Sequence, residues 1–192
     1  MSQPDREFDP DDNFENSFLA GSDIDVDEAT PEALVWQLLL LINPGDEDLA
    51  LQQFDAYRDL AAEAGADDAE DPDVEPVWLL KDVIDWRSGF YVDYKDAGSL
   101  VDSVNELAAR WNLHIDWGVD DSGDDAYLDG VDVPTLMATA YDRLREYGYT
   151  LWTWNTAGDA HAGWMSRSSD DEAMRIVAPA LGIELRPGNE AF

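Results

Sequence analysis

Three side chains in the middle of the chain could act together in acid–base chemistry. His114 and Asp116 are two residues apart, so on a β-strand both would lie on the same face. Asp93 lies in another stretch of alternating residues, 89–95, and would join them if the two strands pair. A histidine beside carboxylates can exchange protons near neutral pH. The same pattern also arises where an acid merely holds a histidine on a sheet face, and no nucleophile lies in an activating motif nearby.

Metal and cofactor motifs are not found among the many carboxylates. Asp23, Asp25 and Asp27 match the opening of a calcium loop. Glu28 then occupies the position that requires glycine, and Leu34 the one that requires a bidentate glutamate. The two histidines lack the spacing of a zinc site, cysteine is absent, and no phosphate-binding glycine loop occurs. We therefore expect neither a metal nor an organic cofactor.

Tryptophan side chains suggest a different kind of site. Trp152 and Trp154 alternate along one expected strand and Trp164 lies in the next, so the three indoles would share a sheet face. Tryptophan and tyrosine contribute strongly to protein interfaces, although N-terminal helices could equally cover this face and make the tryptophans core. The predicted binding surface combines the indoles with polar neighbours and consists of Asp93, His114, Asp116, Trp152, Trp154, Asp159, His161 and Trp164.

The net charge favours a cationic partner. The chain has 44 acidic and 11 basic residues, a net charge of −33, and its first 80 residues hold 23 acids and two bases. This charge opposes binding to nucleic acid and to anionic membranes and attracts basic proteins. Adaptation to high salt, or a genome rich in aspartate and arginine codons, would explain the same composition without any function.

Hydrophobic residues make up 45% of the chain, enough for a packed core. The longest apolar stretch, residues 34–42, falls short of the roughly 18 residues that span a bilayer. Acidic residues precede it, whereas a signal peptide begins with basic ones. We expect a cytoplasmic protein, and export without a classical signal stays open.

The elements that must position these side chains fall into three parts. Residues 1–29 are expected to form an acidic, disordered arm, and residues 30–85 a helical subdomain with an acidic linker at 66–75. Residues 86–192 are expected to form an α/β sandwich. Helical patterns in the subdomain cover residues 31–42, 47–64 and 76–85.

Strand and helix patterns alternate in the C-terminal part. Its last six elements, from Leu113 onward, follow the β-α-β-β-α-β order of ferredoxin-like folds. We therefore predict an α+β protein, a two-layer sandwich with helices on one face and a ferredoxin-like core. Ser169 and Glu172 predict a capping box for the last helix. Strands are expected at 89–95, 113–119, 149–155, 161–167 and 183–186, and helices at 97–111 and 134–147.

Two groups of motifs are familiar when taken together. One pairs GFYVDYKD at 89–96 with LAARWNLHIDW at 107–117, and the other pairs GYTLWTW at 148–154 with AGW at 162–164. In these motifs the chain resembles an uncharacterised bacterial family, domain of unknown function 6630, over residues 34–192. The resemblance implies a bacterial source and supplies no activity and no catalytic residues.

Charge and the lack of a catalytic motif together predict a non-enzymatic acidic binding protein. It would mask or regulate a basic partner, such as a nuclease, a toxin or a nucleic-acid-binding protein. Two alternatives stay open: an enzyme that uses Asp93, His114 and Asp116 on the sheet face, and a domain whose acidity serves only solubility.

Overall fold

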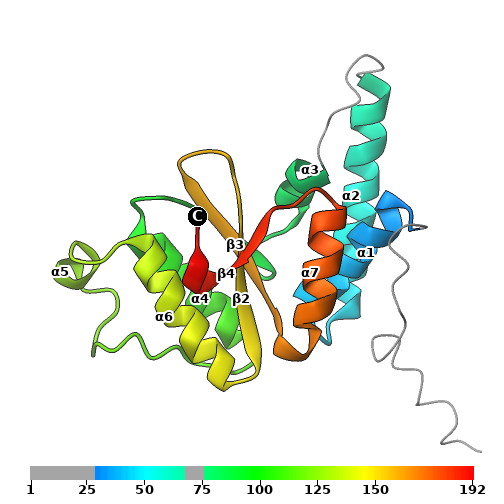
Figure 1. Cartoon of the computed structure of the whole chain (residues 1–192). Helices are drawn as coiled ribbons and strands as arrows, with labels where there is room; N and C mark the ends of the chain where they lie inside the picture. The colour runs from blue at the N-terminus through cyan, green and yellow to red at the C-terminus, as the bar shows by residue number, and fades with distance from the viewer. Residues whose placement is uncertain (1–28, 68–75) are drawn as a thin grey trace, which may run out of the picture.

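The computed structural model describes residues 29–67 and 76–192 (Figure 1). The predicted acidic arm and linker lie outside these ranges, apart from Ala29, Ala66 and Asp67. Helix α2 includes the last two of these, so it runs past the end expected at residue 64. The described helices and strands are α1 Pro31–Ile42, α2 Glu47–Asp67, α3 Pro76–Val83, β1 Gly89–Asp93, α4 Ala97–Ala109, α5 Asp125–Leu128, α6 Val133–Glu146, β2 Tyr149–Trp154, β3 Ala160–Arg167, α7 Asp171–Ala180 and β4 Leu185–Pro187.

The strands form an antiparallel sheet in the order β1-β3-β2-β4. The expected hairpin is confirmed: β2 and β3 pair so that Trp152 lies opposite Trp164. β1 pairs with β3 on one side, Gly89 opposite Trp164, and forms one edge of the sheet. The chain is thus an α+β protein.

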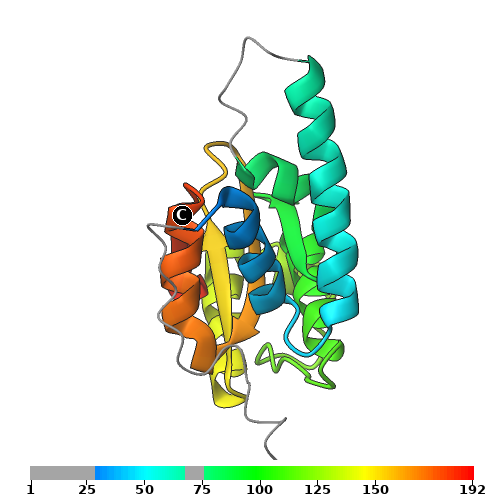
Figure 2. The same cartoon turned by 90° about the vertical axis from the view of Figure 1, so that its right-hand side faces the viewer.

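Helices cover both faces of the sheet, which gives three layers rather than the predicted two. Along β2, Leu151 packs on one face while Trp152 and Trp154 pack on the other, as strand alternation requires. Helices α4 and α6 cover the first face. Helices α1, α3 and α7 cover the tryptophan face, with α2 packed against α1 and α3 (Figures 1 and 2). The N-terminal helices therefore share a hydrophobic core with the sheet.

The predicted strand at residues 113–119 is wrong. Ile115 and Trp117 are buried against α4 and α6, but the segment pairs with no strand. The Trp117 indole donates instead to Asn105 on α4, at 3.0 Å, and Gly118 turns the chain away with φ of +78°. Alternation reports which side of a segment is buried and does not require a ladder of hydrogen bonds. The sheet's first strand is β1, so the ferredoxin-like order is not confirmed.

A local capping signal sets where α1 begins, whereas the one predicted for the last helix does not form. The Thr30 side chain accepts from the Ala33 amide, as expected for a start at Thr30-Pro31. The capping box predicted for the last helix is wrong, because α7 begins at Asp171 and the Ser169 hydroxyl donates to Asp170.

Of the helices that the structure describes, none has the length and apolarity needed to cross a membrane.

A buried polar network fastens the segment between α3 and β1. The Asn43 amide donates to Gln53 Oε1 at 2.8 Å, Gln53 donates to Ser88 Oγ at 2.9 Å, and Ser88 donates back to Asn43 Oδ1 at 2.6 Å. Arg110 at the end of α4 donates to Asn43 Oδ1 at 3.0 Å and to the Arg87 carbonyl at 2.6 Å. Since each buried group finds a partner, the network holds residues 85–89 in one conformation.

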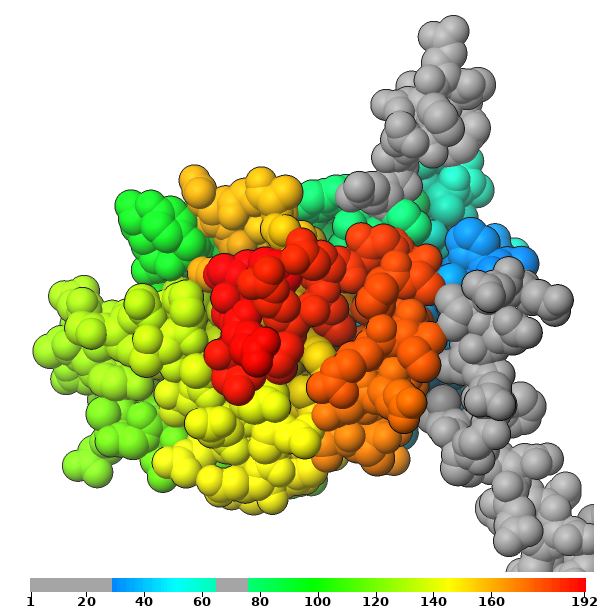
Figure 3. All heavy atoms as spheres, viewed as in Figure 1, coloured from blue at the N-terminus to red at the C-terminus, as the bar shows by residue number. Residues whose placement is uncertain are grey.

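The C-terminal segment closes the opposite edge of the sheet. β4 pairs with β2, and the short turn Gly188–Glu190 that follows packs on α6. Figure 3 shows this red segment lying between the yellow α6 and the orange α7.

Candidate functional site

The predicted binding surface does not form as one exposed face. Trp152, Trp154 and Trp164 share a face as expected, but they are only 1%, 4% and 1% exposed because helices cover them. This is the core role that the sequence left as the alternative. Trp154 and Trp164 still reach a cavity under α3, and Trp152 does not line it.

Two of the predicted acids lie together at one end of the sheet. Asp93 ends β1 and is exposed, and its carboxylate accepts from the Lys95 amide at 2.9 Å. Asp159 is exposed in the β2–β3 turn, where its carbonyl accepts from the Tyr94 amide at 3.1 Å. Neither residue lines the cavity.

His114 and Asp116 lie in the irregular segment that follows α4, and both are exposed. The Asp116 carboxylate accepts from the Gly118 amide at 2.9 Å, and Arg143 lies beside it at 3.9 Å. Because the segment is not a strand of the sheet, it does not bring these residues onto a sheet face with Asp93. Within the described ranges, no three His, Asp or Glu side chains are grouped to hold a metal ion.

His161 lies on the sheet face opposite to the tryptophans. It is buried, and its Nδ1 has no hydrogen-bond partner among the described residues. Burial lowers the pKa of its imidazole from the ordinary value of 6.5, and the charge of Asp132 offsets part of this effect. Burial therefore favours the neutral form of the ring.

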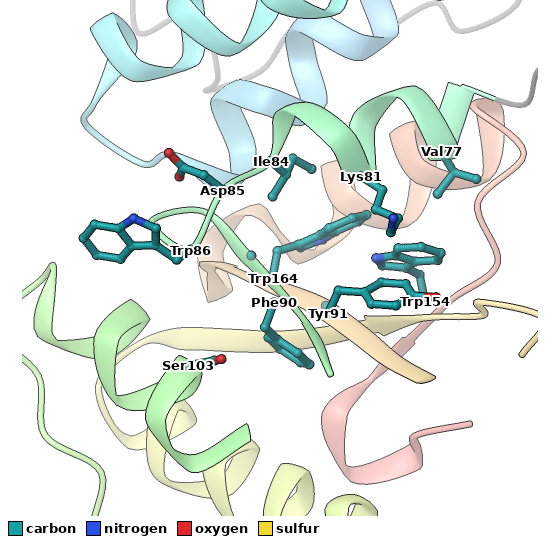
Figure 4. Close-up of a pocket in the computed structure, with 12 residues that line it drawn as sticks. Val77, Lys81, Ile84, Asp85, Trp86, Phe90, Tyr91, Ser103, Trp154 and Trp164 are labelled. Carbon is teal, nitrogen blue, oxygen red and sulfur yellow. The ribbon is translucent and has the colours of Figure 1, made fainter. Parts of the chain in front are cut away.

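A cavity of about 220 Å³ lies under α3, where that helix crosses the start of β1 (Figure 4). Lys81 on α3 and Ile84, which directly follows that helix, point toward the cavity, and Tyr91, Trp154 and Trp164 form the aromatic floor and wall. The remaining lining residues are Val77, Asp85, Trp86, Gly89, Phe90, Ser103 and Gly163.

Glycine allows the strands to approach closely beside this cavity. A Cβ on Gly89 would lie 2.7 Å from the Ile84 side chain and 2.9 Å from the Gly163 carbonyl. A Cβ on Gly163 would meet the Phe90 ring at 2.8 Å and overlap the Trp152 carbonyl. Any larger residue would push α3 away from the sheet or separate the strands, so both glycines are needed for the cavity's shape.

The polar groups in the cavity differ in whether they are already paired. Asp85 is fully engaged: its carboxylate accepts the Arg87 amide at 3.0 Å and the guanidinium at 2.9 and 2.6 Å. These hydrogen bonds raise the pKa of the Arg87 guanidinium. The Lys81 ammonium lies 4.9 Å from the centre of the Tyr91 ring and 3.6 Å from the exposed Asp82 carboxylate. The Trp164 indole N–H is buried with no partner among the described residues.

Exposed aromatic side chains lie beside the cavity and at the end of β1. We call Trp78, Trp86, Tyr91 and Tyr94 the aromatic rim; each is more than one-third exposed, and Trp86 is 62% exposed. Trp78 packs edge-on against Trp154, which lines the cavity, and Trp86 and Tyr91 line it themselves. The chain's two lysines lie here too, Lys81 over Tyr91 and Lys95 over Tyr94 at 4.7 Å.

The sequence pointed to two of the lining residues, Trp154 and Trp164, and missed the rest of this region because α3, residues 84–88 and β1 looked like separate elements. A signal was present nonetheless. Both lysines of a very acidic chain and five aromatic residues fall within residues 78–95.

Comparison with known proteins places the chain in a family. No curated protein and no solved structure matches it. A family model described as "Domain of unknown function (DUF6630)" matches residues 34–188, which include every element that borders the cavity. The chain therefore belongs to the family of the domain of unknown function DUF6630.

Proposed function

We propose that this protein is a non-enzymatic binding protein that docks a basic protein partner on its aromatic rim. The observation that carries the proposal is the exposure of two tryptophans and two tyrosines around one sheet edge. Large exposed aromatic side chains are costly in water and are typical of interface centres. Trp86 is the most exposed of the four and makes no aromatic pair among the described residues.

Charge supports a basic partner. The net charge of −33 creates a negative field that accelerates the approach of a cationic protein. The segment 111–142 contributes eight acids and no lysine or arginine. Several of these acids also cap backbone amides, such as Asp124 on Ala126 and Asp132 on Thr135. Capping uses one carboxylate oxygen and leaves the negative charge in place. These residues therefore stabilise the fold and also contribute to the negative potential around it.

Affinity capture with the full chain tests the proposal. We expect basic proteins, of the nuclease, toxin or nucleic-acid-binding kind, to be recovered at low salt and to be reduced at high salt. Trp86→Ala should weaken capture of the same protein about 30-fold, since an interface tryptophan is worth about 2 kcal/mol or more. Tyr147→Ala is the matched control, because Tyr147 is 53% exposed at the far end of α6.

The contrary results are equally specific. Equal losses for both variants, or recovery of proteins that are not basic, would contradict docking on the rim. Recovery of no protein at either salt would favour the alternative in which acidity serves only solubility. The bacterial source and the cytoplasmic location expected from the sequence stay predictions.

A further inference from the structure

We propose that the cavity under α3 is a binding site for a small aromatic acid, a single ring that carries a carboxylate. This ligand is distinct from the protein partner proposed above and does not depend on it. Three observations lead to it: the size of the cavity, the donors of Lys81 and Trp164 in its lining, and its aromatic walls.

Size limits the ligand to about one ring. A cavity of about 150 Å³ lined by apolar side chains holds benzene. The volume under α3, about 220 Å³, leaves room for a ring with one small substituent. Pockets for larger ligands usually measure about 300–1,000 Å³, so a nucleotide or a typical cofactor would not fit within the cavity.

The buried polar group of the cavity that has no partner among the described residues is a donor, so a ligand that pairs with it must offer an acceptor. Among tryptophans with similar burial, Trp152 donates to Ser166 at 2.9 Å and Trp117 donates to Asn105 at 3.0 Å. The Trp164 N–H differs, since it is buried at the cavity wall without a partner in the described structure. A buried donor without an acceptor is costly, so an acceptor bound in the cavity would remove that cost.

Charge makes this acceptor an anion. Lys81 points into the cavity. Its ion-pair partner Asp82 is 63% exposed, so it competes only weakly with a bound anion for the ammonium. Asp85, the carboxylate that lines the cavity, is already occupied by Arg87. A ligand carboxylate would thus meet an ammonium and an indole N–H, both donors that favour it.

Aromatic walls account for the ring. Trp154 and Trp164 lie roughly parallel, 29° apart with centres separated by 6.4 Å, and Tyr91 lies 6.1 Å from Trp154. A planar ring can pack along these faces with offset or edge-on geometry. A carboxylate alone would leave this apolar surface wet.

Titration calorimetry with defined probes tests the site in the full chain. We expect benzoate to bind at least tenfold more tightly than neutral benzyl alcohol and at least tenfold more tightly than acetate. Lys81→Met should weaken benzoate binding at least tenfold and leave benzyl alcohol binding within twofold. Lys95→Met is the matched control, since it removes the same charge from the other lysine, outside the cavity lining, and should change benzoate affinity less than twofold.

The indole N–H provides a readout that needs no stable variant. Benzoate should shift the Trp164 indole proton downfield in a nitrogen-15 correlation spectrum and leave the paired Trp152 indole unchanged. The tripeptide Gly-Gly-Phe, tested with a free and with an amidated carboxyl end, supplies the same chemistry from a chain end. No benzoate binding, equal effects of the two lysine variants, a static Trp164 signal, or tighter binding of the tripeptide than of benzoate would each overturn the proposal.

Discussion

Replacing Arg110 by methionine tests how much stability the buried polar network contributes to the fold. The Arg110 side chain is 16% exposed and donates to Asn43, to the Arg87 carbonyl and to Asp46, the last at 2.7 Å. These hydrogen bonds join the end of α4 to the segment between α3 and β1 and to the turn between α1 and α2. Methionine keeps a similar apolar stem and removes all three of them.

The expected cost follows from what each partner loses. The Arg87 carbonyl is left without the donor that the structure gives it, which costs about 1–3 kcal/mol. Asn43 Oδ1 keeps the Ser88 hydroxyl and loses about 0.5–1.5 kcal/mol. Asp46 is 44% exposed, so its ion pair adds only about 0–1 kcal/mol. We expect the free energy of unfolding to fall by about 2–4 kcal/mol, which corresponds to a Tm lower by about 5–15 °C.

Urea unfolding followed by tryptophan fluorescence measures this change. The m-value should stay constant, because the folded state buries the same surface. The matched control is Arg186→Met, whose side chain is 46% exposed and pairs with the exposed Glu184, and its cost should stay below about 1 kcal/mol. Equal costs for the two variants would refute the claim that the network carries this stability.

Acid conditions add a second check on the same variant. Arg110 is the largest cause of the lowered pKa of Asp46, whose ordinary value is 3.8. A lowered carboxyl pKa stabilises the fold above 3.8, and this stability is lost as the pH falls through the folded-state pKa. The difference in free energy of unfolding between wild type and Arg110→Met should therefore become smaller below about pH 3.8.

Two other positions give predictions of different kinds. Burial lowers the pKa of His161, so its neutral ring stabilises the fold above 6.5, and this contribution is lost as the pH falls from 6.5 toward the folded-state pKa. Chemical unfolding from pH 7 to 5 should show this loss of stability in wild type and in His114→Gln but not in His161→Gln. If His161→Gln still loses stability over this range, another group is responsible. Gly163→Ala should destabilise by about 3 kcal/mol or more, because its Cβ overlaps a carbonyl and the Phe90 ring. Gly123→Ala, at a site where the nearest atom is 3.4 Å away, should cost less than about 1 kcal/mol, and similar costs by thermal unfolding would contradict the role of Gly163.

Elements that are specified locally could be predicted from the sequence. Thr30 before α1 and Pro31 at its first position set its start, and the alternating run from Tyr149 with the turn before β3 set the hairpin. The covering of the tryptophan face by helices was an open alternative, and only tertiary packing decided it. The strand prediction for residues 113–119 failed for the same reason, because the alternation there comes from packing on α4 and α6.

The cavity could not be predicted because it has no motif. Its wall depends on α3, residues 84–88 and the edge strand β1, which come together through the shared hydrophobic core and through the network around Asn43 and Ser88. Composition carried a partial signal, because an acidic chain with two lysines places both beside exposed aromatic rings. In a strongly acidic chain, the few lysines are therefore worth locating first.

Salt separates the two proposals because the charges act over different distances. A basic partner is attracted by the whole negative surface, and this long-range attraction is screened beyond about 8–10 Å at physiological ionic strength. A small aromatic acid is repelled by that same surface and held by Lys81 at contact distance, where screening is weak. Raising the salt should therefore weaken the protein complex and strengthen benzoate binding. If both affinities fall together with salt, the acid is held by diffuse charge rather than by the groups in the cavity, and the assignment of Lys81 fails.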